Sequence, residues 1–167
     1  GDGILDCFIN DRDGRLQYWE GQVDWQFGDR PIFTLVTKFF QGLLVGIWFN
    51  FNDFDNDGDH DLLSHTPGTD NVSYYENVNG TLHLVNSQLH TPSGFPVYGG
   101  QIVIPTVADI DADGYLDYFV GDISGRLAYY AGQGNVDTGP QFEFVSDYFE
   151  NIQIIWTPGR HGANSIS

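Results

Sequence analysis

The sequence predicts an all-β protein built from repeated four-stranded sheets. Three observations support this class: an aspartate-rich motif recurs, other features repeat at the same spacing, and short strand-like runs alternate with glycine, asparagine and aspartate turns. Equivalent Asp-Gly pairs are 55 residues apart from Asp2 to Asp57 and 56 residues apart from Asp57 to Asp113. A strand-rich repeat of this length is typical of β-propeller blades. The chain of 167 residues is therefore predicted to hold about three blades.

The expected strands are short and rich in β-branched and aromatic residues, with turn residues between them. They cover residues 33–36 in the first repeat, 46–51, 61–65, 72–77 and 81–85 in the second, and 102–108, 117–121, 126–130 and 141–145 in the third. Aromatic pairs recur at the same period, at Tyr18-Trp19, Tyr74-Tyr75 and Tyr129-Tyr130. Turns are expected over 122–126 and 132–140, and the segment 146–156 is too short and too β-branched to predict a helix.

The repeat boundaries follow from this period. We expect a first blade over 1–45 that lacks its innermost strand, a second over 46–100, a third over 101–150, and the start of a following blade over 151–167. Because propellers close with four to eight blades, the chain is predicted to be part of a longer propeller or to associate with copies of itself. The longer propeller is favoured, because both ends of the chain fall within a motif.

Composition excludes several classes of function. The formal net charge of −17 argues against binding to nucleic acid and to anionic membrane surfaces. No apolar run reaches the length of a membrane-spanning helix. Cys7 is the only cysteine, so the chain cannot form an internal disulfide. The chain opens at Gly1 without a methionine, which suggests a processed or incomplete polypeptide.

The repeated motif D-x-D-x-D-G-x-x-D has the donor chemistry of a calcium site. Alternate side chains converge if the backbone curls around one point, and the glycine allows that curvature. Calcium takes six to eight oxygen ligands from carboxylates, carbonyls and water. The predicted ligands are Asp53, Asp55, Asp57 and Asp61 with the carbonyl of Asp59, then Asp109, Asp111, Asp113 and Asp117 with the carbonyl of Tyr115. In the first repeat only Asp2 and Asp6 remain of the motif.

Other metal sites fit the motif less well. An EF-hand needs a glutamate at the twelfth loop position and flanking helices, but Ser64 and Val120 occupy that position and strand-like runs follow. Magnesium prefers fewer protein ligands. Zinc and copper favour histidine or cysteine, and His60 falls at a non-ligand position.

The two complete loops, together with "DYFVGDISGRLAYYAG" and "DLLSHTPGTDNVSYYENVNGT", resemble the FG-GAP/VCBS repeat family, which includes the calcium-binding blades of integrin α-subunit propellers. The resemblance covers essentially the whole chain as three units. It implies that each loop joins the first two strands of a four-stranded blade and binds Ca²⁺ through the aspartates named above.

The function expected from these features is non-catalytic. No catalytic motif is present, and the paired carboxylates belong to the loops. We expect an extracellular or cell-surface calcium-binding propeller with a structural or adhesive role, whose partners are other proteins or further blades. Two alternatives are a lectin-like propeller that binds glycans and an accessory domain of a larger secreted enzyme or toxin. The aromatic pairs are better explained by packing than by a sugar platform, and Asn71 and Asn79 fit the glycosylation pattern.

Overall fold

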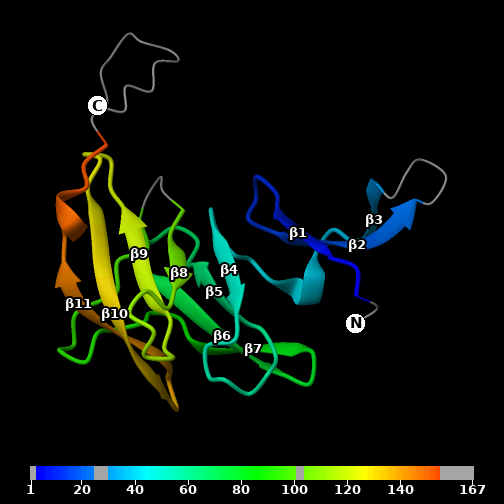
Figure 1. The fold of residues 1–167 in the computed structure, drawn as a ribbon. Coiled ribbons are helices and arrows are strands. Elements are labelled where there is room, and N and C mark those ends of the chain that lie inside the picture. The colour runs from blue at the N-terminus through cyan, green and yellow to red at the C-terminus, as the bar shows by residue number, and fades with distance from the viewer. Residues whose placement is uncertain (1–2, 25–29, 101–103, 155–167) are drawn as a thin grey trace, which may run out of the picture.

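The computed structural model describes residues 3–24, 30–100 and 104–154 (Figure 1). These residues form three antiparallel sheets in which consecutive strands are neighbours. The first sheet contains β1 (Cys7–Asn10), β2 (Leu16–Asp24) and β3 (Arg30–Thr37). The second contains β4 (Phe49–Asn52), β5 (Asp61–His65), β6 (Val72–Val78) and β7 (Thr81–Asn86). The third contains β8 (Thr106–Ala108), β9 (Asp117–Gly121), β10 (Leu127–Val136) and β11 (Gly139–Ser146).

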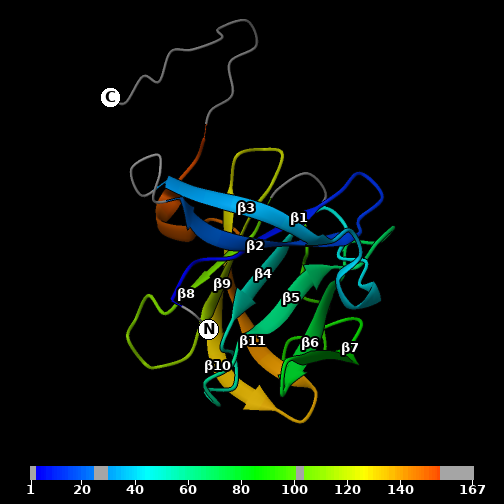
Figure 2. The ribbon, with the colours of Figure 1, turned by 90° about the vertical axis from the view of Figure 1, so that its right-hand side faces the viewer.

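The all-β prediction is confirmed. The helical elements within the described ranges are the single 3₁₀ turns η1 (Phe40–Gly42) and η2 (Phe149–Asn151). None of the described helices is long and apolar enough to span a membrane. The three sheets lie one after another along the molecule, each a meander, in the manner of propeller blades (Figures 1 and 2).

Two strands predicted from the sequence begin later in the structure. The strand expected at 46–51 is β4, which starts at Phe49, and the strand expected at 102–108 is β8, which starts at Thr106. Trp48, just before β4, instead donates its indole N–H to the carbonyl of Gly99 at 2.6 Å. Residues 102 and 103 lie outside the described ranges.

The turn predicted over 132–140 is present but shorter, because it is confined to Asp137 and Thr138. β10 continues to Val136, and β11 begins at Gly139, so only two residues separate the strands. The glycines that suggested a turn lie in a bulge, where the β10–β11 register shifts between Gly132 and Asn135. Gly134 adopts φ +89°, a conformation that glycine accepts without steric cost.

Two hydrophobic cores hold the sheets together, one at each junction. The core between the first and second sheets contains Leu16, Leu43, Val45, Leu62 and Leu82. The core between the second and third sheets includes Trp48, Leu63, Val72, Tyr74, Tyr118, Val120 and Phe142. Full burial of an apolar side chain of this kind contributes about 1.5–3 kcal/mol to the free energy of folding. The junctions therefore supply most of the hydrophobic stabilisation.

The strand β5 shows how the sequence produces this stacking. All five of its residues are buried. Side chains alternate between the two faces of a strand, so Leu62 packs toward the first sheet and Leu63 toward the third. Because both faces of β5 are covered, its polar residues Asp61, Ser64 and His65 are buried together with the two leucines.

Candidate metal centres

Each aspartate loop connects the first two strands of a four-stranded sheet. Loop 2 (residues 53–61) joins β4 to β5, and loop 3 (residues 109–117) joins β8 to β9. The fourth and sixth positions of both loops have positive φ: 63° at Asn56 and 97° at Gly58, then 62° at Ala112 and 92° at Gly114. These left-handed residues curl the backbone, so that alternate side chains face inward.

The inward carboxylates organise the loop through hydrogen bonds to backbone N–H groups. In loop 2, the N–H of Asp57 donates to carboxylate oxygens of Asp53 and Asp55, each at 3.2 Å. The N–H of Gly58 donates to Asp53 at 3.1 Å. Loop 3 repeats this pattern, since the N–H of Asp113 donates to Asp109 and Asp111, each at 3.2 Å. The two loops thus share one geometry despite their different intervening residues.

Three aspartates in each loop come close enough to hold one cation. In loop 2, one carboxylate oxygen from each of Asp53, Asp55 and Asp57 lies within 4.8 Å of the others. In loop 3 the group consists of Asp109, Asp111 and Asp117, so the ninth-position aspartate takes the place of the fifth-position one. Asp61 and Asp113 are not in these groups. The described ion pairs involve Arg15 and Arg126 but no loop carboxylate.

The ninth-position aspartates also tie the loop to the sheet. Asp61 is 1% exposed and accepts hydrogen bonds from the Asn77 N–H at 2.9 Å, the Tyr74 hydroxyl at 2.9 Å and the Phe54 N–H at 3.3 Å. Asp117 is equally buried and accepts from the backbone N–H groups of Gly132 at 2.8 Å and Ile110 at 2.9 Å. Each of these aspartates therefore holds the loop entry and the third strand of the sheet in place.

Asp61 and Asp117 act as clamp aspartates, because each fixes the loop entry to the third strand. The sequence analysis did not predict this role or the groups that donate hydrogen bonds to the clamp aspartates. The tyrosine hydroxyls were not recognised as hydrogen-bond donors to the loops. The signal was available, because the first tyrosine of each aromatic pair follows the clamp aspartate by 12 or 13 residues. Asp6 has the same role in the first sheet, where it accepts from the Tyr18 hydroxyl at 3.0 Å and the Gly21 N–H at 2.9 Å. Asp6 belongs to neither acidic group, and Asp2 lies outside the described residues.

The electrostatics of loop 2 favour a bound cation. Burial raises the pKa of Asp55, a hydrogen bond from the Asp57 N–H lowers it, and nearby carboxylates raise it further. The pKa of Asp59 is raised by burial and then by Asp57, Asp55 and Asp53. One carboxylate oxygen of Asp59 is buried and has no hydrogen-bond partner. A calcium ion would offset the repulsion among these carboxylates, and calcium prefers the oxygen ligands that the loop offers.

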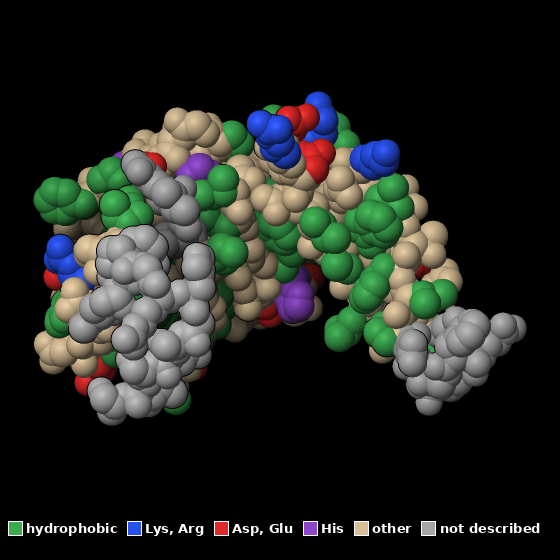
Figure 3. All heavy atoms as spheres, turned by 90° about the horizontal axis from the view of Figure 1, so that it is seen from above, with side chains coloured by type: hydrophobic (Ala, Val, Ile, Leu, Met, Phe, Trp, Pro, Cys, Tyr) green, Lys and Arg blue, Asp and Glu red, His purple; other side chains and the backbone are tan. Residues whose placement is uncertain are grey.

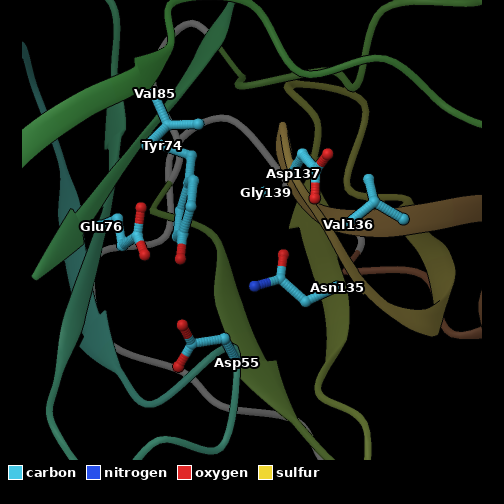
Figure 4. A pocket seen from close by; sticks show the side chains of 8 residues that line it. All are labelled: Asp55, Tyr74, Glu76, Val85, Asn135, Val136, Asp137 and Gly139. Carbon is cyan, nitrogen blue, oxygen red and sulfur yellow. The ribbon is translucent and has the colours of Figure 1, made fainter.

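A polar pocket of about 340 Å³ joins loop 2 to the third sheet. Its walls come from loop 2 and the outer strands of the second sheet on one side, and from the β10–β11 hairpin on the other. Figure 4 shows the Asp55 carboxylate, the Tyr74 hydroxyl and the Asn135 amide directed toward one another. Asp55 therefore belongs both to the acidic group of loop 2 and to the wall of this pocket.

Residues 53–120, from the start of loop 2 into β9, match the family model described as an FG-GAP-like repeat. This match confirms the predicted family resemblance over a segment that contains both complete loops. Searches of curated proteins and of solved structures found no match.

Proposed function

We propose that this chain is a calcium-stabilised, non-catalytic propeller segment that binds other proteins and works outside the cytoplasm. The observation that carries the proposal is that both loops share one backbone hydrogen-bond pattern and that each brings three aspartate oxygens within 4.8 Å of one another. The match to the FG-GAP-like repeat, a repeat that often binds calcium, supports the same conclusion.

The residues that would hold calcium are Asp53, Asp55 and Asp57 in loop 2 and Asp109, Asp111 and Asp117 in loop 3. Asp61 and Asp113 complete the proposed sets, with the carbonyls of Asp59 and Tyr115. When bound, calcium supplies positive charge that neutralises these carboxylates and rigidifies the loop. The clamps at Asp61 and Asp117 would then transmit that rigidity to the sheets.

The extracellular location rests on the affinity expected of such loops. Calcium loops of micromolar or weaker affinity fill where free calcium is millimolar. The net charge of −17 agrees with a solvent-exposed acidic protein. Glycan binding has less support, because Trp48 is 2% exposed and Tyr74 is 1% exposed, so neither can form a stacking platform. Trp25 and Trp156 lie outside the described residues.

Calorimetric titration of calcium into chelator-treated protein tests the proposal. Two sites are expected in the wild-type chain, one in the Asp57→Ala or Asp113→Ala variant, and none in the double variant. Magnesium serves as the competing ion and is expected to bind far more weakly, because it keeps its waters. The absence of calcium binding at millimolar concentration would refute the proposal.

A further inference from the structure

A pocket of about 190 Å³, called the turn pocket here, lies at the junction between the first and second sheets. It is lined by residues 12–14 of the β1–β2 turn, residues 46–47 before β4, His65 at the end of β5, and residues 67–68 of the β5–β6 turn. All of these residues lie within the described ranges. Because β5 runs from Asp61 to His65, the turn pocket and loop 2 lie at opposite ends of this strand.

His65 brings an imidazole without hydrogen-bond partners to the turn pocket. The residue is 6% exposed, and its Nδ1 is buried and has no partner. The ring lies against the backbone of Gly46, where an added Cβ would overlap Nδ1. A proton on Nδ1 would be a buried donor without an acceptor, which is unfavourable. The neutral ring is therefore expected to carry its proton on Nε2, which makes Nε2–H the donor that a ligand in the pocket can use.

Arg12 is a second donor at this pocket whose guanidinium is not engaged. Arg15 and Arg126 each form two ion pairs, whereas Arg12 has no ion pair or hydrogen bond with any residue that the structure describes. Figure 3 shows Lys and Arg side chains next to Asp and Glu side chains on the face seen from above. The carboxylate of Asp13 also lines the pocket, but it pairs with Arg15 at 2.9 Å.

Backbone groups around the turn pocket also leave donors without acceptors. The carbonyl of Gly14 accepts the Val45 N–H at 2.8 Å. The carbonyl of Gly46 accepts the Asn10 side-chain amide at 2.8 Å. By contrast, the N–H groups of Gly46 and Ile47 donate to no residue within the described ranges. The pocket is therefore rich in free donors, while the acceptors named here are already occupied.

We infer that the turn pocket binds a carboxylate group, carried by a side chain of a partner protein, that accepts hydrogen bonds from Arg12 and His65. An ionised carboxylate is an acceptor-only group, and it matches the planar fork of a guanidinium. The volume of about 190 Å³ is below the roughly 300–1,000 Å³ of pockets for drug-sized ligands, so it suits the end of one side chain.

The kind of partner follows from the charge of the whole chain. A net charge of −17 repels a strongly acidic protein, so the partner is expected to offer one carboxylate from an otherwise neutral or basic segment. That the carboxylate comes from a protein rests on the proposed protein-binding function. The preference for a carboxylate rests only on the donors in the pocket.

An NMR titration with a capped tripeptide that contains one central glutamate tests the inference. The peptide should shift the Nε2 resonance of His65 and the amide resonances of Gly46 and Ile47, with curves that saturate at millimolar concentration. The glutamine counterpart of the peptide should bind about tenfold more weakly or worse, because it lacks the charge. Inorganic phosphate is the competing anion, and phosphate binding as tight as that of the glutamate peptide would overturn the assignment to a carboxylate.

Substitution of Arg12 tests the same contact from the protein side. Arg12→Gln should weaken binding of the glutamate peptide by about tenfold or more, because a charge-assisted pair is lost. Arg126→Gln is the matched control, since it removes the same charge from the β9–β10 turn, which does not line the pocket. Equal losses in the two variants would mean that only the overall charge matters, and would overturn the inference. His65 is followed by its resonance rather than replaced, because a variant of a buried residue could unfold.

Calcium binding, measured by calorimetry on the same protein, separates this inference from the proposed metal function. Protein that binds calcium in both loops but leaves the glutamate peptide unbound would overturn the carboxylate pocket alone. Protein that binds the peptide but no calcium would refute the calcium sites alone, because the pocket shares no residue with either acidic group. A carboxylate of the same chain that already fills the pocket would also leave the peptide unbound, and would overturn the inference of a partner.

Discussion

At the scale of single residues, the aspartates of one loop have different tasks. Asp57 is an exposed residue in the middle of loop 2, whereas Asp61 is buried and accepts three hydrogen bonds from the sheet and the loop entry. Removal of a buried acceptor leaves its donors without partners, and each unsatisfied donor costs about 1–3 kcal/mol. The two aspartates should therefore respond differently to substitution.

We predict that Asp61→Ala lowers the free energy of unfolding of the calcium-free protein by roughly 2–4 kcal/mol. Asp57→Ala should leave the calcium-free stability within about 0.5 kcal/mol of wild type, because its side chain is exposed. Asp57→Ala should instead lose the stabilisation that calcium adds through loop 2. Urea unfolding in chelator and in calcium measures both quantities. Equal losses for the two variants in chelator would show that Asp61 is not a structural clamp.

The raised pKa of Asp55 predicts the sign of a pH effect. A carboxyl whose folded-state pKa lies above its ordinary value of 3.8 binds its proton more tightly in the folded state. Its contribution to stability is therefore largest at low pH and is lost as the pH rises from 3.8 through the raised value. In chelator, wild type should lose more stability over this interval than Asp55→Asn, as measured by unfolding at a series of pH values.

Asp122 is the matched control with the opposite sign. A hydrogen bond from the Ser124 hydroxyl lowers the pKa of Asp122, so its contribution is present above pH 3.8 and is lost as the pH falls through the lowered value. Asp122→Asn should flatten the acid limb of the stability profile and leave the effect of Asp55 unchanged. Identical pH profiles for Asp55→Asn and wild type would refute the role given to Asp55.

At the scale of structural elements, the β10–β11 hairpin supports the second sheet through Tyr74. Gly139 begins β11 at φ +106°, and a Cβ at this position would lie 2.5 Å from a ring carbon of Tyr74. Tyr74 in turn donates its hydroxyl to Asp61. The hairpin therefore positions the ring of Tyr74, and the Tyr74 hydroxyl positions Asp61 at the end of loop 2. A small change at Gly139 should consequently affect loop 2.

We predict that Gly139→Ala destabilises the protein by about 2–4 kcal/mol, from the left-handed conformation and from overlap with a buried ring. Gly94→Ala is the control, because Gly94 also has a positive φ of 85° but a Cβ added there would meet no other atom within 4 Å. Gly94→Ala should lower the free energy of unfolding only by the cost of the left-handed conformation, about 1–2 kcal/mol. Thermal unfolding of both variants gives the comparison, and equal costs would mean that Tyr74 moves aside freely.

At the scale of the whole molecule, the charge of −17 makes the metal-free protein repel itself. Two bound calcium ions would change that charge from −17 to −13, since each ion adds two positive charges. Salt screens exposed charges with a Debye length of about 10 Å at 0.1 M. Monovalent salt and calcium should therefore relieve the same repulsion.

We predict that sodium chloride raises the melting temperature in chelator and raises it less in calcium. Calcium at a hundredfold excess over its dissociation constant should add about 2.7 kcal/mol per site. The Asp57→Ala, Asp113→Ala double variant should show the same salt response in both buffers. A melting temperature that chelator leaves unchanged would contradict metal stabilisation of the fold.

Several features could be predicted from the sequence because they depend on short-range patterns. β5 and β9 have the predicted bounds, since a motif aspartate marks where each begins. The aspartate loops and their glycine were predictable because steric limits on the backbone act locally. The β10–β11 bulge was not predictable from the same local signals. Glycines favour a turn in isolation, and only pairing with β11 draws them into a strand.

The amino-acid sequence by itself determined the all-β class, the repeat period and the oxygen-rich loops of this protein. The tertiary structure decided that Asp61 and Asp117 are buried clamps and that Tyr74 supports one of them. The physical reason is that these properties depend on which sheet face lies against which. A residue's burial and hydrogen-bond partners come from segments far away in the chain, which local sequence patterns do not encode.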